Sequence, residues 1–182
     1  YLPEAVINYL ARLGWSHGDQ EIFSMQEMMQ YFSLEKITTS AAIFNPEKLQ
    51  WLNQQYIQSA DPIKLAEQLE PFLIKEGVLI EQHGLSKKEI AKPIPSLNQR
   101  SQTLVEMAQK SAFYFKKDLI FDEKARDKFL NKEIKPHIEK LITVINDMTL
   151  FEHDPLENLF KKVAEETGLK LGKLAQPVRV AL

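Results

Sequence analysis

Helix-start signals recur along the 182-residue chain, and they constrain its fold more than any other feature. A polar capping residue stands directly before proline at Asn45-Pro46 and Asp61-Pro62, and Ser-x-x-Glu boxes begin at Ser24 and Ser86. After each signal, apolar residues recur three and four positions apart, which is the period of an amphipathic helix. No sustained alternation of apolar and polar residues competes with this pattern. We therefore predict an all-α fold, a helical bundle or superhelix of two packed helical subdomains.

The boundary between the two subdomains is expected near Ser59 to Asp61, where polar and turn-forming residues separate two helical patterns. This gives the ranges 1–60 and 61–182. Within the second range, one helix is predicted from Ser96 to about Lys110. Its apolar residues turn toward a core and leave Arg100 on the exposed flank.

Two helices near the start of the chain are predicted to bury apolar stripes. The first, over residues 3–13, carries Leu10 on its apolar side, and the second follows Ser24 with Met25, Met28 and Met29. We assign these methionines to the core. A methionine stripe can also form an adaptable binding groove, because its side chains are flexible and polarizable.

Composition narrows the kinds of site that the chain can hold. It has no cysteine, which excludes disulfides and thiolate metal sites, and its four histidines stand singly without a second ligand at helical spacing. No glycine-rich loop follows a strand, and no apolar run approaches the ~20 residues of a membrane span. We therefore predict no catalytic residue, no metal site and no membrane contact. A reducing compartment, the cytoplasm, fits this composition.

The net charge of −2 conceals an asymmetry between the two halves of the chain. Residues 1–85 carry 5 basic and 11 acidic side chains, whereas residues 86–182 carry 18 basic and 14 acidic ones. The second half could therefore face a polyanion. Lysine is also an ordinary residue of solvated helix surfaces, so charge alone leaves both interpretations open.

An aromatic segment lies within the basic half. Phe113, Tyr114 and Phe115 are followed by Lys116 and Lys117, and then by Phe121. Aromatic side chains interleaved with lysine could stack on unpaired bases of single-stranded RNA. Clustered phenylalanine is also typical of a core, and we favour the core for these side chains.

Three sequence blocks resemble the bacterial glutamyl-tRNA synthetases. They are LPEAVINYLARLGWSHGDQE near the start of the chain, FNPEKLQWLNQQYI in the middle and KLGKLAQPVRVAL at its end. In that family the first block directly follows the catalytic domain, and the other two come later in the same order. The HIGH-like and KMSKS-like motifs of the catalytic domain are absent here, and the chain begins with Tyr1 rather than methionine. We therefore expect a fragment.

The resemblance implies recognition of tRNA rather than chemistry. Enzymes of this family use ATP and Mg²⁺ to attach glutamate to tRNA(Glu), and their helical modules hold the tRNA. Residues 1–60 would form the junction and the stem-contacting subdomain, and residues 61–182 an anticodon-binding subdomain truncated at its C-terminal end. The fragment alone would be catalytically inactive and need no cofactor. Its expected partners are tRNA(Glu) and the missing catalytic domain, and it is expected to be a monomer.

The matching blocks imply roles for five residues. Arg100, in LNQRSQTLVEMAQ, matches a family arginine that contacts the third anticodon base, and Arg179, in AQPVRVAL, matches a second anticodon-contacting arginine. His17, Trp51 and Asn53 match positions near the tRNA stem or the domain junction, and packing is the expected role of Trp51. In that family a Thr-Gly loop normally follows the last block, and we expect this loop, with part of the family's anticodon site, to be missing here.

A helical protein-interaction module descended from such a domain is the alternative function. An exposed basic surface containing Arg100 and Arg179 would favour RNA binding. Burial of both arginines in ion pairs would favour the interaction module.

Overall fold

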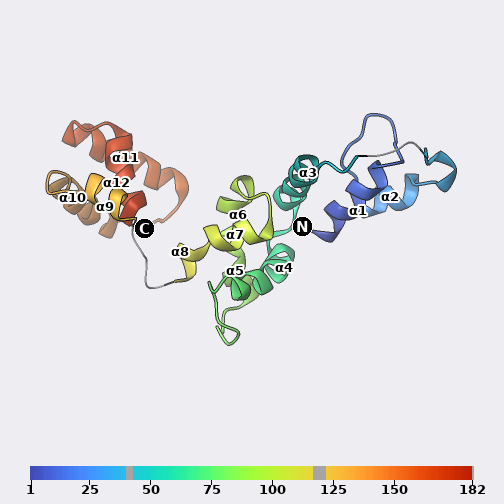
Figure 1. Cartoon of the computed structure of the whole chain (residues 1–182). Coiled ribbons are helices and arrows are strands. Elements are labelled where there is room, and N and C mark those ends of the chain that lie inside the picture. Colours follow the sequence, from blue (N-terminus) through green and yellow to red (C-terminus); the bar gives the residue numbers. More distant parts are fainter. Residues whose placement is uncertain (40–42, 117–121, 182) are drawn as a thin grey trace. The chain divides into compact units, whose positions relative to one another are not determined.

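The computed structural model describes residues 1–39, 43–116 and 122–181, and every regular element in these ranges is a helix (Figure 1). The all-α prediction is therefore confirmed. The chain divides into two compact units, residues 1–116 and 117–182. Among the described residues no helix is long and apolar enough to cross a membrane.

The first unit contains short and medium-length helices, several of them opened by the caps that the sequence predicts. Ser24 with Glu27 and Ser86 with Glu89 form complete capping boxes. Asn45 and Asp61 each accept hydrogen bonds from the first turn of the helix that follows. The elements are α1 (Pro3–Arg12), α2 (Met25–Tyr31), η1 (Leu34–Lys36), α3 (Pro46–Ser59), α4 (Pro62–Lys75), α5 (Lys87–Ala91), α6 (Ile94–Leu97), η2 (Asn98–Arg100), α7 (Leu104–Lys110) and α8 (Ala112–Phe115).

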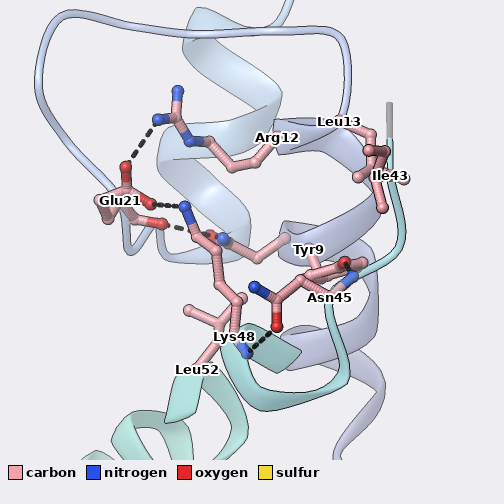
Figure 2. A pocket seen from close by; sticks show the side chains of 9 residues that line it. Tyr9, Arg12, Leu13, Glu21, Ile43, Asn45, Lys48 and Leu52 are labelled. Atoms are coloured by element: carbon pink, nitrogen blue, oxygen red, sulfur yellow. Dashed lines mark hydrogen bonds and ion pairs between the residues drawn. The ribbon is translucent and has the colours of Figure 1, made fainter. Parts of the chain in front are cut away.

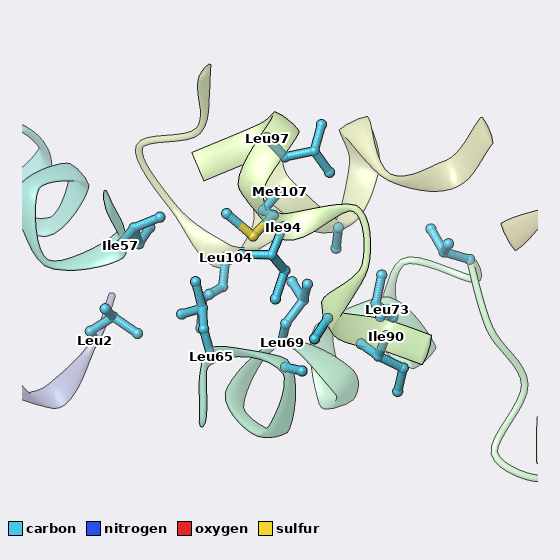
Figure 3. Close-up of a cluster of buried hydrophobic side chains, with 14 of the residues drawn as sticks. Leu2, Ile57, Leu65, Leu69, Leu73, Ile90, Ile94, Leu97, Leu104 and Met107 are labelled. Atoms are coloured by element: carbon cyan, nitrogen blue, oxygen red, sulfur yellow. The ribbon is translucent and has the colours of Figure 1, made fainter. Parts of the chain in front are cut away.

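Helix α4 supplies the centre of the main core of this unit. Leu65, Leu69 and Leu73 lie four residues apart on one face, and each is at most 1% exposed. They lie in one cluster with Met107 of α7 (Figure 3). Helix α4 continues through Pro71 to Lys75.

The same core takes side chains from both sides of residues 60 and 61. Leu2 and Ile57 lie in one buried cluster with Leu65 and Leu104 (Figure 3). The division into residues 1–60 and 61–182 is therefore not a division of packing. It stays a prediction about the roles of the two segments.

The single helix predicted from Ser96 to Lys110 is wrong. Helix α6 ends at Leu97, η2 follows, and Ser101 is extended before α7 begins at Leu104. The break has a local cause, because the Thr103 hydroxyl accepts a hydrogen bond from the backbone N–H of Glu106 at 3.2 Å and so caps α7. Thr-x-x-Glu is a helix-start signal in its own right.

The predicted burial of the apolar stripes near the start of the chain is only partly correct. Met28 is buried, but Met29 is 73% exposed and Leu10 57% exposed. Together with Ile7, Ala11 and Phe32 they line an open apolar groove between α1 and α2, which we call the α1–α2 groove.

The second unit is built from α9 (Glu123–Phe129), α10 (Lys135–Asn146), α11 (His153–Thr167) and α12 (Leu171–Ala181). Its buried core is Leu141, Val163, Ala164 and Leu174. Gly168 ends α11 with a positive φ of 68°, as its position in the sequence predicts. Glu152 precedes the first turn of this helix.

Candidate nucleic-acid interface

Arg100 closes η2, and the backbone around it is held from two helices. From α3, the Gln54 amide donates to the carbonyl oxygen of Gln99 at 2.9 Å. From α7, the Lys110 ammonium donates to the carbonyl oxygen of Arg100, and the Glu106 carboxylate accepts from the N–H of Gln102 at 2.7 Å. The backbone that carries Arg100 is therefore fixed by side chains from outside its own element.

The Arg100 side chain itself is exposed and makes no ion pair with any described residue. Residues 86–116 around it carry six basic and two acidic side chains. Residues 122–181 carry equal numbers of both, so the positive excess of the second half of the chain is concentrated near Arg100. A fixed backbone with a free guanidinium in a cationic segment suits recognition of an anionic or acceptor-rich partner.

Arg179 lies on α12, and residues earlier in this helix line a cleft of about 520 Å³ in the second unit. It is exposed and likewise makes no ion pair with a described residue. Gly172 and Gln176 line the cleft and precede Arg179 by seven and three positions, which places all three on one face of α12. The other lining residues are Lys128, Phe129, Asn131, Glu133, Ile134, His137, Leu169, Lys173 and Pro177.

His17 is half-buried in an aromatic cluster of the first unit. Its ring stacks on Tyr31 with centroids 4.2 Å apart and an interplanar angle of 6°. The ring of Trp15, which is buried, lies 6.2 Å away at 18°. His17 therefore helps to shape the loop between α1 and α2, and its expected position near a tRNA stem stays a prediction.

The end of that loop is fixed by an ion-pair network beside a small pocket (Figure 2). One carboxylate oxygen of Glu21 lies 2.8 Å from the Arg12 guanidinium, and the other lies 2.9 Å from the Lys48 ammonium. The hydrogen bond from Lys48 lowers the pKa of the Glu21 carboxyl, burial opposes it, and Arg12 lowers it further. The network joins α1 to α3 and holds the loop that carries His17.

Trp51 and Asn53 lie on α3 in different environments. Trp51 is 41% exposed, which does not fit the packing role expected for it, and its ring is accessible at the surface. Asn53 is fully buried. Its Oδ1 accepts from the N–H of Leu2 at 2.7 Å, and its Nδ2 donates to the carbonyl oxygen of Gln102 at 2.5 Å. Asn53 therefore acts within the protein, where it links the start of the chain to the loop after Arg100.

The aromatic segment after α7 is divided between core and surface. Phe115 packs against the main core, but Phe113 and Tyr114 are each 46% exposed. The core assignment is therefore wrong for these two side chains. Lys117 and Phe121, which the same prediction included, lie outside the described residues.

One group of described side chains could gather three metal ligands, namely His153, Asp154 and Glu157. All three are exposed, and Nδ1 of His153 already lies 2.9 Å from the Asp154 carboxylate. We assign no metal site to them.

Residues 64–182 match the family model described as the anticodon binding domain. The chain belongs to this family. Residues 1–51 match a second model, described as the catalytic domain of class I tRNA synthetases (E and Q). The two matches flank the predicted boundary at residues 60 and 61.

Over its full length the chain is similar to glutamate–tRNA ligases. It is 47% identical over 182 residues to the one of Geotalea uraniireducens strain Rf4, and 46% identical over 181 residues to the one of Syntrophobacter fumaroxidans. Each comparison covers 100% of this chain and 38% of the relative, so the chain spans little more than a third of the length of these curated relatives.

Solved structures give the same family relationship. A glutamate tRNA ligase from Elizabethkingia meningosepticum, crystallised with its amino acid, aligns over 100% of this chain and 35% of its own, with a TM-score of 0.80 and 32% identity. The glutamate-tRNA synthetase of Elizabethkingia anophelis aligns over 98% of this chain and 34% of its own, with a TM-score of 0.72 and 32% identity.

Proposed function

We propose that this chain is the tRNA(Glu)-binding, anticodon-recognising part of a cytoplasmic glutamate–tRNA ligase. The observation that carries the proposal is the exposure of both arginines that match anticodon contacts. Arg100 and Arg179 lie within the segment that matches the anticodon-binding family, and neither is used in an ion pair with a described residue. This arrangement does not favour the alternative, a protein-interaction module in which the two arginines are buried in ion pairs.

The chemistry of recognition follows from the shape of arginine. A guanidinium offers a planar fork of donors, and an unpaired cytosine presents acceptors that such a fork can bond. A guanine in the same place presents a larger edge with a different pattern of donors and acceptors. Because the backbone of Arg100 is held by Gln54 and Lys110, little ordering of that loop would be needed on binding.

The α1–α2 groove supports a contact with the rest of a catalytic domain. The groove lies wholly within residues 1–51, the segment that matches the class I catalytic family. Ile7, Leu10 and Met29 expose 44%, 57% and 73% of their surface there. Apolar side chains gathered in this way mark a contact surface rather than a solvated one.

ATP and Mg²⁺ would be used by the whole ligase. In the family that this chain resembles, the HIGH-like and KMSKS-like motifs hold the nucleotide, and neither occurs in this sequence. We therefore expect no ATP–pyrophosphate exchange from this chain alone, with glutamate and tRNA present. ATP–pyrophosphate exchange at the rate of an intact ligase would contradict the assignment of this chemistry to the rest of the ligase.

Binding of tRNA(Glu) to the chain tests the proposed function. We expect weak binding that falls steeply between low and physiological salt, because it depends on contacts of lysine and arginine with phosphates. Arg179→Gln should weaken it. Arg126→Gln is the matched control, since Arg126 is an exposed arginine of the same unit that is paired with Asp127. An affinity that did not change with salt concentration would contradict the proposal. An equal loss of affinity in Arg179→Gln and Arg126→Gln would also contradict it.

A further inference from the structure

We infer that Phe113 and Tyr114 form a stacking platform for an unpaired nucleobase, next to the loop that carries Arg100. This inference rests on the proposed function, because it takes single-stranded RNA as the partner. In this inference the RNA contacts an aromatic surface in addition to Arg100 and Arg179.

The two rings lie against each other at the surface. Their centroids lie 4.1 Å apart with planes inclined by 33°, and each side chain is 46% exposed. The Tyr114 hydroxyl lies 2.7 Å from the hydroxyl of Ser96, which ties it to α6. Phe115, the next residue, packs against the main core and so fixes α8 to the first unit.

The pair is placed close to the Arg100 loop by two contacts. Ser96 lies on α6, four residues before Arg100, and α6 leads directly into η2. Lys110, at the end of α7 and three residues before Phe113, donates to the carbonyl oxygen of Arg100. The segments that carry the aromatic pair and Arg100 therefore belong to one local assembly of α6, η2, α7 and α8. Helices α6, α7 and α8 are labelled in Figure 1.

Charge and exposure together indicate the class of partner. A solvent-facing aromatic pair is costly in water and is best covered by another flat apolar surface. In this assembly the surrounding segment has an excess of four positive charges over residues 86–116, which favours a partner that is both aromatic and anionic. Unpaired bases on a phosphate backbone combine these properties, and stacking on an aromatic side chain is their common mode of binding.

Fluorescence of 2-aminopurine in an anticodon stem-loop of tRNA(Glu) sequence tests the platform, with the probe placed at one unpaired position at a time. We expect the full chain to quench the probe at one or more positions, and Phe113→Leu to remove that quenching. Phe113→Leu should also weaken binding by at least about fivefold, while the dependence of affinity on salt stays the same, because stacking releases no counterions.

Two variants serve as controls. Tyr114→Phe keeps the ring and loses only the contact with Ser96, so it should retain most of the quenching. Phe151→Leu removes an exposed phenylalanine from the second unit and should behave like the wild type. Circular dichroism of each variant checks that it is folded.

The remaining outcomes separate this inference from the proposed function. Binding of the stem-loop by the wild type with no effect of Phe113→Leu on quenching or affinity would overturn the platform alone. If Phe113→Leu changed the melting temperature of the protein but not its affinity for RNA, the platform would also be overturned. That result would indicate that these rings contact protein. Absence of any stem-loop binding by the wild type would overturn the proposed function as well.

Discussion

Asn53 donates a hydrogen bond from Nδ2 to the backbone carbonyl oxygen of Gln102, across 2.5 Å and 49 positions of sequence. The same amide accepts from the N–H of Leu2 through its other end. One buried side chain of α3 therefore satisfies polar groups of two segments, the start of the chain and the loop that follows Arg100. Buried polar groups of this kind are costly when they lose their partner.

Removal of this amide should destabilise the first unit. We expect Asn53→Ala to lower the free energy of unfolding by about 2 to 4 kcal/mol, because it leaves a donor and an acceptor without partners. Urea unfolding followed by tryptophan fluorescence measures this, since Trp15 and Trp51 both lie in the first unit. Gln54→Ala, which removes a hydrogen bond at the surface, is the control. A loss below about 1 kcal/mol in Asn53→Ala would show that the link is not needed.

Tyr56 gives a prediction about pH. Its hydroxyl donates to the carbonyl oxygen of Phe23 at 2.6 Å and lies 3.0 Å from Oδ1 of the buried Asn8. Burial raises the pKa of Tyr56 to about 12, above its ordinary value near 10. Because the folded-state pKa is the higher one, this contribution to stability is complete below pH 10 and is lost as the pH rises through about 12.

Phenolate absorbance of the folded protein measures the titration of Tyr56. The difference between the wild type and Tyr56→Phe isolates it from the other four tyrosines. A midpoint near 10 in the difference curve would show that the Tyr56 hydroxyl is not buried as described.

Substitution of Thr103 tests whether its capping hydrogen bond causes the break between η2 and α7. Thr103→Ala should cost about 1 kcal/mol of stability, because the N–H of Glu106 loses its capping hydroxyl. Thr143→Ala removes an exposed threonine within α10 and should change stability by less than about 0.5 kcal/mol. Equal effects of the two substitutions would argue against the cap.

The helical class and most helix starts could be predicted from the sequence, because caps such as Asn45 and Asp61 act over a few residues. The break at Ser101 was missed although Thr103 and Glu106 carry the signal for it. Apolar spacing on both sides of the break happens to continue in register, so periodicity alone favours one long helix. The role of Gln54 has no sequence signal, since its contact with Gln99 spans 45 positions.

Exposure was the least predictable property of the candidate site. Leu10, Met29, Phe113 and Tyr114 have the residue types of a core, and local sequence does not tell a core face from a contact face. The predicted exposure of Arg100 is confirmed, and it fits the rule that a charged side chain is rarely buried without a partner.

The α1–α2 groove leads to a prediction about the intact ligase. In the isolated chain Leu10→Asp should change stability by less than about 0.5 kcal/mol, because Leu10 is 57% exposed. In the intact ligase the same substitution should lower the melting temperature, since it would place a charge in a contact with the catalytic domain. Ile142→Asp, at an exposed position of α10, is the control in both proteins. Equal melting temperatures of wild-type and Leu10→Asp ligase would contradict the contact.

We propose that Arg100 reads the third base of the anticodon. The most direct measurement is the charging efficiency of the intact ligase, wild type and Arg100→Gln, on two tRNAs that differ only in that base. We expect Arg100→Gln to lose roughly 1 to 3 kcal/mol of discrimination between the cytosine and guanine forms, the value of a bidentate contact between arginine and a base. Arg100→Lys should fall between, because it keeps the charge and loses the fork. If Arg100→Gln lowered the charging efficiency on both tRNAs equally, their ratio would be unchanged. That result would show that Arg100 binds phosphate and would contradict the proposal.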